Sequence, residues 1–151
     1  MSIIWSDKTF KNLNSEELYA ILRLRSEVFV VEQNCIFLDM DNKDQHCQHL
    51  MCWDKNNLLA VARIVPPEIS YAESSIGRIV SSPAARGLGI GKELVSKAIQ
   101  LCYNLHGKRV IRIGAQYYLK GFYESFGFIQ ESPIYLEDGI EHIEMILPIH
   151  H

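Results

Sequence analysis

The chain has 151 residues, of which 48% are hydrophobic and 22% charged, and its formal net charge is −3 at pH 7. These values are typical of one globular domain, residues 1–151, with enough chain to bury a core without disulfides or metal ions. The slightly acidic balance argues against a general nucleic-acid-binding protein. No apolar run approaches the roughly 18 residues of a membrane-spanning helix, and residues 1–7 lack the features of a signal peptide, so we expect a cytoplasmic protein with no membrane partner.

The first half of the chain predicts one helix among short strands. Asn14 is a suitable N-cap, and Glu17 follows it by three residues, as in a capping box. Apolar residues then recur at helical spacing from Leu18 to Phe29. In chain order, the expected elements are a strand at 3–5, a helix from 15 to about 31, a polar and acidic loop at 34–48, and strands at 49–53 and 58–65 around a turn at 55–57.

The second half predicts a long helix between two strands, followed by a short helix and a hairpin. The expected elements are a strand at 76–81, a helix ending near 106, a strand at 109–115, a short helix at 119–126, and strands at 129–136 and 140–148 around Asp138-Gly139. The unit at 74–115 should form a right-handed parallel crossover, and the remaining strands should be antiparallel. This order indicates a mixed α/β (α+β) fold, a mixed central sheet flanked by helices, and not a doubly wound sheet.

A glycine-rich turn, Arg86-Gly87-Leu88-Gly89-Ile90-Gly91, stands between the strand at 76–81 and the long helix. Such a turn exposes unpaired backbone N–H groups at the positive end of the helix dipole, where phosphates bind. Its glycines lack the G-x-G-x-x-G spacing of dinucleotide-binding turns, and Glu93 after Lys92 excludes the Walker A pattern. A tight strand-to-helix turn without any ligand would use the same glycines, so the turn alone does not decide the function.

Two motifs and the order of elements resemble the GCN5-related N-acetyltransferase (GNAT) superfamily. Residues 79–91 are similar to its acetyl-CoA signature, and residues 116–128, with Phe122-Tyr123 near their centre, are similar to its last-helix motif. Ser81 and Gln116 depart from the residues usual there, an aliphatic residue and Asn. The segments that resemble the narrower ElaA-like branch are Arg25-x-x-Val28-Phe29 to Cys35, the acidic segment to His49, Ile76-Gly77-Arg78, Gly114-Ala115-Gln116 and Glu137-Asp138-Gly139-Ile140-x-His142.

The resemblance implies transfer of an acetyl group from the co-substrate acetyl-CoA directly to a primary amine of a small molecule or peptide. Backbone N–H groups of the glycine turn would hold the pyrophosphate, and the pantetheine arm would pair with the strand edge at 79–81, where an N–H would also stabilise the oxyanion. Tyr123 would protonate the departing thiolate, although a tyrosine there can also only pack against the cofactor. The expected cofactor-binding residues are Ile79, Val80, Ser81, Arg86, Gly87, Leu88, Gly89, Ile90, Gly91, Lys92, Gln116 and Tyr123.

The acceptor amine must lose a proton to a base or to a chain of water molecules, because an ammonium ion has no lone pair. The catalytic candidates for this step are Glu32, His49 and His142, and histidine is favoured because it titrates near neutral pH. Structural roles stay open for two of them, since Glu32 can end the first helix and His49 can begin a strand. The further candidates are Asp44, His46 and Glu141.

The segment from 35 to 49 is rich in Asp, His and Cys. It does not match a calcium loop, because Lys43 stands at the fifth position from Asp39 and the required glycine is absent. His46, Cys47 and His49 could bind zinc, but their spacing matches no common zinc module. We expect instead a solvated acidic loop over the acceptor site, whose charge attracts a cationic amine, and no metal.

Two other functions stay open. The motif Arg25-x-x-Val28-Phe29, with the acidic segment after it, also resembles the start of acyl-homoserine-lactone synthases, which share the acyltransferase fold. The second alternative is a catalytically silent module that binds acetyl-CoA or a protein. The sequence reveals neither the acceptor amine nor the oligomeric state, which monomer and homodimer fit equally, and we expect no nucleic-acid partner.

Overall fold

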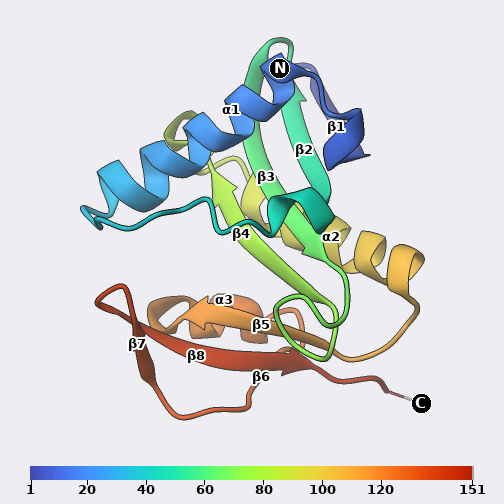
Figure 1. The fold of residues 1–151 in the computed structure, drawn as a ribbon, viewed down its shortest axis with the longest axis vertical. Helices are drawn as coiled ribbons and strands as arrows, with labels where there is room; N and C mark the ends of the chain where they lie inside the picture. The colour runs from blue at the N-terminus through green and yellow to red at the C-terminus, as the bar shows by residue number, and fades with distance from the viewer. Residues whose placement is uncertain (151) are drawn as a thin grey trace.

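Two antiparallel sheets diverge from a single parallel contact (Figure 1). The structure, a computed structural model, describes residues 1–150. The first sheet has the order β1 (Ile3–Thr9), β2 (Gln48–Asp54), β3 (Asn57–Val65) and β4 (Ser75–Ser81). In the second sheet, β8 (Ile140–Leu147) pairs with β5 (Ile111–Gln116) on one side and with β6 (Ile129–Gln130) and β7 (Tyr135–Glu137) on the other.

The expected parallel pairing within 74–115 is confirmed, but it is confined to one bridge. Ser74 faces Ile111 in a parallel bridge, and the N–H of Arg112 donates to the carbonyl oxygen of Ser74 at 3.1 Å. Beyond this bridge the two strands separate, so that β4 is an edge strand of the first sheet and β5 an edge strand of the second. Beyond the bridge, β4 and β5 therefore face each other along edges that are not paired to each other.

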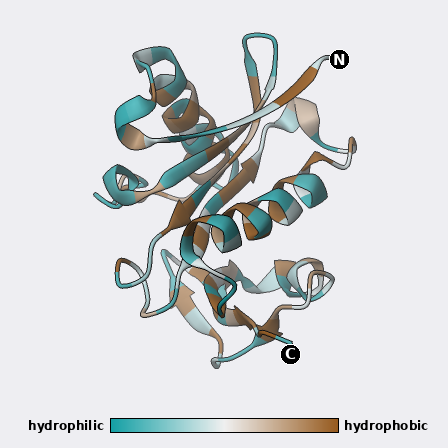
Figure 2. Cartoon of the chain, turned by 90° about the vertical axis from the view of Figure 1, so that its right-hand side faces the viewer, coloured by the Kyte–Doolittle hydropathy of each residue, from teal (hydrophilic) through white to brown (hydrophobic). Residues whose placement is uncertain are grey.

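Two helices cover opposite faces of the first sheet (Figure 1). On one face, α1 (Ser15–Arg25) contributes Ile21 and Leu24 to a cluster with Val61 of β3. On the other, α2 (Ile90–His106) packs against the alternate residues Ala60 and Ala62 of the same strand. Figure 2 shows both helices as alternating hydrophilic and hydrophobic stretches beside hydrophobic central strands. Because β3 is buried on both faces, its residues from 58 to 65 are apolar except for Arg63.

The first helix begins as predicted and ends differently. Asn14 accepts from the backbone N–H of Glu17, and the Glu17 side chain accepts from the Asn14 N–H, which completes the capping box. The expected helix to residue 31 is regular only to Arg25 and continues as a π-helical segment, η2 (Ser26–Glu32). Wide turns of this kind are frequent at functional sites. Here η2 directs Phe29 toward the cavity described below.

Glycines end or begin the later helices. Gly89, with φ of 75°, is the N-cap of α2, and Gly107, with φ of 89°, is its C-cap. The short helix predicted at 119–126 is η5 (Tyr117–Leu119) followed by α3 (Lys120–Glu124). Shorter helical turns are η1 (Phe10–Asn12), η3 (Asp44–His46) and η4 (Pro83–Ala85). Within residues 1–150, no helix has both the length and the apolar character needed to cross a membrane.

The single strand predicted at 129–136 is wrong, because it is split into β6 and β7. Gln130 pairs with Met145, whereas Tyr135 pairs with His142, so the edge strand carries extra residues between these pairs. Pro133 lies in the interruption and has no N–H to donate to β8. Beside the interruption, the β8 N–H of Glu144 donates to a side-chain oxygen, Ser132 Oγ, at 2.8 Å.

Candidate functional site

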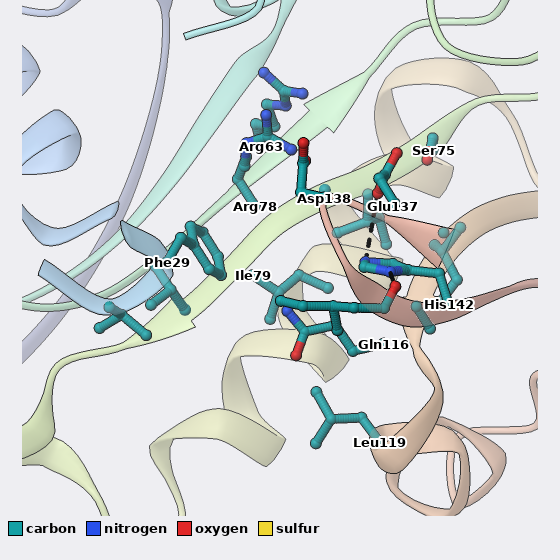
Figure 3. Close-up of a pocket in the computed structure, with 18 of the residues that line it drawn as sticks. Phe29, Arg63, Ser75, Arg78, Ile79, Gln116, Leu119, Glu137, Asp138 and His142 are labelled. Atoms are coloured by element: carbon teal, nitrogen blue, oxygen red, sulfur yellow. Dashed lines mark hydrogen bonds and ion pairs between the residues drawn. The ribbon is translucent and has the colours of Figure 1, made fainter. Parts of the chain in front are cut away.

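A cavity of about 700 Å³ lies where β4 and β5 separate. Its lining comes from η2, the segment after it, β4, the start of α2, β5, α3 and the turn between β7 and β8. Figure 3 shows Ile79 of β4, Gln116 of β5 and His142 of β8 gathered in its centre, with Arg63 and Arg78 at one side. The cavity therefore brings together side chains from both sheets that are far apart in the sequence.

The glycine-rich turn stands at one end of this cavity. Arg86 and Gly91 line it, whereas Gly87, Leu88, Gly89, Ile90 and Lys92 do not. Gly87 and Gly89 have φ of 82° and 75°, and a Cβ added to either would meet no atom within 4 Å. The first N–H groups of α2 have no acceptor within the helix, and Gly89 offers no side chain to accept from them. The backbone of the turn is thus open to a ligand, while the Ile90 side chain is buried in the core.

The edge of β4 forms one wall. Ile79, Val80 and Ser81, which the sequence predicts to bind the cofactor, all line the cavity. The strand contains a bulge, because Val61 of β3 faces Val80 while Arg63, two residues on, faces a residue three positions back in β4. Bulges of this kind bend a strand and redirect its side chains. Within residues 1–150, no strand pairs with this edge on the side that faces β5 beyond the bridge at 74.

Tyr123 of α3 lies between the core and the cavity. Its ring is 6% exposed and contacts Phe122 and Phe128 edge-on, with centroids 5.2 and 6.0 Å apart. Burial, and then the neighbouring Tyr118, raise the pKa of the Tyr123 hydroxyl well above its usual value. The phenol therefore stays protonated over the physiological pH range. Its position lets a ligand in the cavity reach a side chain that can donate a hydrogen bond.

His142 of β8 is held in one tautomer at the cavity wall. Its Nδ1 lies 2.8 Å from the carbonyl oxygen of Ile140, which can only accept, so Nδ1 carries the proton. Its Nε2 lies 3.4 Å from a carboxylate oxygen of Glu137, and the ring stacks on Tyr135 with centroids 5.9 Å apart (Figure 3). Nε2 is thus the nitrogen with a free lone pair, and the Glu137 carboxylate faces it if it takes up a proton.

Gln116 of β5 bonds to Gln33, which follows η2. The two side-chain amides exchange hydrogen bonds of 3.1 and 3.4 Å across the cavity. Sequence reasoning selected Gln116 but not Gln33, because no local pattern shows that the end of the first helix meets the end of β5. The pair links the two halves of the chain at the cavity.

Two of the four catalytic candidates do not reach the cavity. Glu32 lies at the exposed end of η2, where both of its oxygens bond to the guanidinium of Arg86, the shorter pair of atoms 2.5 Å apart. His49 is 1% exposed and its Nε2 lies 2.9 Å from the carbonyl oxygen of Asp44. Burial lowers the pKa of His49. Of the four candidates, the structure brings only Tyr123 and His142 to the cavity.

The expectation of a solvated acidic loop is wrong. Asp39 and Asp44 are 5% and 6% exposed, and three arginines from α1, β3 and β4 pair with them and with Asp41. Although burial opposes ionisation of Asp41 and Asp44, their arginine partners hold both pKa values below the usual range. The ion pairs are Arg25–Asp39 at 2.8 Å, Arg25–Asp44 at 2.7 Å, Arg63–Asp41 at 2.6 Å, Arg63–Asp44 at 3.0 Å, Arg78–Asp39 at 2.8 Å and Arg78–Asp41 at 3.4 Å.

Both cysteines of this segment bond to backbone carbonyl oxygens, Cys35 to that of Asp138 and Cys47 to that of Lys43. Cys47 donates to the carbonyl oxygen of Lys43 at 3.2 Å, and burial raises the pKa of its thiol to about 11. Across residues 1–150, no three His, Cys, Asp or Glu side chains are grouped as metal ligands. His46, Cys47 and His49 therefore do not converge on one point.

The arginine partners were missed, although the sequence carries a signal for them. Arg63 interrupts an otherwise apolar strand, and Arg25 lies at helical spacing from the buried Ile21 and Val28. Charged residues at such positions are almost never fully buried unless they are paired. That rule predicts a carboxylate partner for each, but not which carboxylate.

Comparisons with known proteins agree with this fold. The profile described as "Acetyltransferase (GNAT) domain" matches residues 13–149. Protein ElaA of Escherichia coli strain K12 is 41% identical over 145 residues, which cover 95% of each chain. An acyl-CoA N-acyltransferase from Pseudomonas aeruginosa has a similar structure, with a TM-score of 0.91 and 41% identity over 96% of this chain and 99% of that one. The ElaA crystal structure matches with a TM-score of 0.89 and 39% identity over the same shares.

A more distant likeness concerns the fold alone. A CoA-dependent acyl-homoserine lactone synthase has a TM-score of 0.80 over 99% of this chain and 84% of its own, at 13% identity. The identity and coverage of the ElaA match and the span of the family profile are far more specific. The chain belongs to the GNAT acetyltransferase family, in its ElaA-like branch.

Proposed function

We propose that the protein transfers an acetyl group from acetyl-CoA to a primary amine on a small molecule or a peptide. The observation that carries the proposal is the cavity between β4 and β5, which has a proton donor, Tyr123, and a histidine with a free lone pair, His142, in its lining. Family membership supports acyl transfer from an acyl-CoA. We further propose that the acyl group is acetyl, that the acceptor is a primary amine, and that the protein is a cytoplasmic monomer or homodimer whose chain forms one domain.

The cavity suits an acyl-CoA thioester. The open turn around Gly87 and Gly89 would bind the pyrophosphate through backbone N–H groups, and Cβ-free residues let phosphate oxygens approach closely. The edge at Ile79 to Ser81 would pair with the amides of the pantetheine arm. Arg86 adds positive charge at that end, shared with Glu32.

Two side chains would move the protons. His142 Nε2 accepts a proton from the acceptor ammonium, and the Glu137 carboxylate beside it stabilises the imidazolium. The free amine then attacks the thioester carbonyl, the C–S bond breaks, and the nitrogen gives up its second proton, which returns through solvent to the Tyr123 oxygen. The Tyr123 hydroxyl donates its proton to the departing thiolate, and burial keeps this hydroxyl protonated until then.

Acetyl-CoA binding by calorimetry, followed by thiol release with a panel of primary amines, tests the proposal. Binding with amine-dependent thiol release is the expected result. Binding without release for every amine would favour the silent module, and the absence of binding would refute an acetyl-CoA site.

The two side-chain roles are tested with matched variants. We expect Tyr123→Phe to lower kcat by about 100-fold with little change in acetyl-CoA affinity. Tyr19→Phe, which changes an exposed tyrosine of α1, is the control. Full turnover by Tyr123→Phe would assign the proton to water.

For His142→Gln we expect a large loss of kcat/KM at pH 7 that is progressively recovered as the pH rises and the free amine becomes abundant. His106→Gln, at the end of α2 and outside the cavity lining, is the control. An unchanged pH profile in His142→Gln would refute the base role.

A further inference from the structure

The bulge of β4 places a bulky residue in a left-handed backbone conformation at the cavity wall. Arg78 has φ of 49°, and it lies in the extra-residue region between Gly77 and Val80. For residues other than glycine this conformation is unfavourable, because Cβ approaches the following carbonyl oxygen. Some interaction of this residue must offset that cost, and the next residue, Ile79, begins the cavity edge.

The side chain of Arg78 makes contacts that can do so. Its Nη2 donates to the backbone oxygen of Asp39 at 2.8 Å and lies 3.4 Å from Asp41 Oδ2. Its Nε lies 2.8 Å from Asp39 Oδ1, off the hydrogen-bond direction, so this contact is an ion pair only. The guanidinium also lies 5.9 Å from the centroid of the Phe37 ring.

The two aspartates are themselves fixed from the other side. Arg25 Nε holds Asp39 at 2.8 Å, and Arg63 holds Asp41 through two hydrogen bonds of 2.6 and 2.8 Å. Arg25 and Arg63 are buried in α1 and β3. Asp39 and Asp41, each held by a buried arginine, thus also pair with Arg78, a partly exposed residue of β4 with a left-handed backbone.

We propose that Arg78 is a positioning residue: its ion pairs with Asp39 and Asp41 hold the left-handed bulge of β4, and through it the Ile79 to Ser81 edge that binds the thioester substrate. The link to substrate rests on the proposed function, whereas the link to backbone geometry does not. The acidic segment, expected from sequence to attract the acceptor, acts in this proposal on the backbone that receives the acyl donor.

Three variants separate the backbone from the side chain. Arg78→Ala removes the ion pairs and keeps the penalty on positive φ, so the bulge loses its support. Arg78→Gly removes both the ion pairs and the penalty, because glycine adopts positive φ readily. Arg78→Lys keeps one positive charge near Asp39. Lys55, with φ of 54° in the turn after β2, supplies matched controls, Lys55→Ala and Lys55→Gly, away from the cavity.

Acetyl-CoA affinity by calorimetry is the first measurement. We expect Arg78→Ala to weaken binding about tenfold, Arg78→Gly to lie within about threefold of the parent, and Arg78→Lys to fall between them. The Lys55 variants should bind like the parent. Thermal unfolding should show similar losses for Arg78→Ala and Arg78→Gly, because both lose the same ion pairs and the strain that glycine relieves is offset by the conformational entropy it adds to the unfolded chain. A role in overall stability alone would make affinity follow the melting temperature, and this would overturn the proposal.

Amide hydrogen exchange at residues 79–81 is the second measurement, and it requires no ligand. Exchange should be fastest in Arg78→Ala and closer to the parent in Arg78→Gly. Equal or greater damage in Arg78→Gly by both measurements would overturn the proposal. Equal losses of affinity in Arg78→Ala and Arg78→Gly, with parent-like exchange in both, would also overturn it and would indicate that the guanidinium contacts the ligand. If the parent binds no acetyl-CoA, the proposed function fails while the exchange order still decides the role of Arg78.

Discussion

Replacing Arg25 by alanine is expected to lower the free energy of unfolding by about 3 kcal/mol at pH 7. The Arg25 side chain is 1% exposed and joins α1 to Asp39 and Asp44 at 2.8 and 2.7 Å. Removing one partner of a buried ion pair costs about 3–5 kcal/mol, because the remaining charge is left without compensation. The lower end applies here, since Asp39 keeps Arg78 and Asp44 keeps Arg63, at 2.8 and 3.0 Å.

Thermal and urea unfolding measure this loss. For a chain of this length, about 3 kcal/mol corresponds to a fall in Tm of roughly 6–12 °C. Arg23→Ala is the matched control on the same helix, because Arg23 is exposed and lies 3.9 Å from Glu27; its effect should stay within about 0.5 kcal/mol. A loss below about 1 kcal/mol for Arg25→Ala, or equal losses in both variants, would refute the reasoning.

The difference in unfolding free energy between the parent and Arg25→Ala should depend on pH. The arginines lower the folded-state pKa of Asp44 against the opposing effect of burial. The stabilisation that ionised Asp44 gives to the folded protein is therefore complete above its unfolded-state pKa of 3.8, and it is lost as the pH falls through the lower folded-state pKa. The gap in stability between the parent and Arg25→Ala should therefore narrow below about pH 4.

Two further predictions concern the glycine turn and the buried histidine. Gly89→Val should weaken acetyl-CoA binding more than about tenfold and leave the circular dichroism spectrum unchanged, because φ of 75° is unfavourable for valine but the space around the position is open. Gly107→Val imposes similar strain at the other end of α2 and should leave the affinity unaltered. Equal affinities for both variants would remove the turn from the site. Burial lowers the pKa of His49 in the folded state, so the contribution of neutral His49 to stability is complete above the unfolded value of 6.5 and is lost as the pH falls below it. In His49→Gln, the dependence of the unfolding free energy on pH between 7 and 5 should therefore be shallower by up to about 1.4 kcal/mol per pH unit. An unaltered slope would show that His49 takes up its proton equally in the folded and unfolded states.

The elements that sequence predicted well are those set by local chemistry. The Asn14–Glu17 capping box and the glycines at both ends of α2 depend on neighbours within a few residues, and the structure confirms them. The interruption at Pro133 had a local cause that was overlooked in the predicted strand. The widening of the first helix after Arg25 has no local sequence signature among these residues.

The environment of the acidic segment could not be predicted in the same way. Whether Asp39 and Asp44 are solvated depends on Arg25, Arg63 and Arg78, which are 14 to 39 residues away in the chain. Local polarity favours exposure, and only the tertiary pairing reverses it. The same holds for His49, whose position at the start of a strand is compatible with a catalytic or a buried role until the packing of Asp44 over it is known.

The arginine–aspartate cluster also changes where an acceptor cation would be recognised. Three aspartates face three arginines, so the segment once expected to attract an amine presents little net charge to the cavity. The carboxylate that stands beside the proposed base is Glu137, which is 59% exposed at its side chain and 3.4 Å from His142. Attraction of an ammonium ion and removal of its proton would then occur at the same place, the turn between β7 and β8.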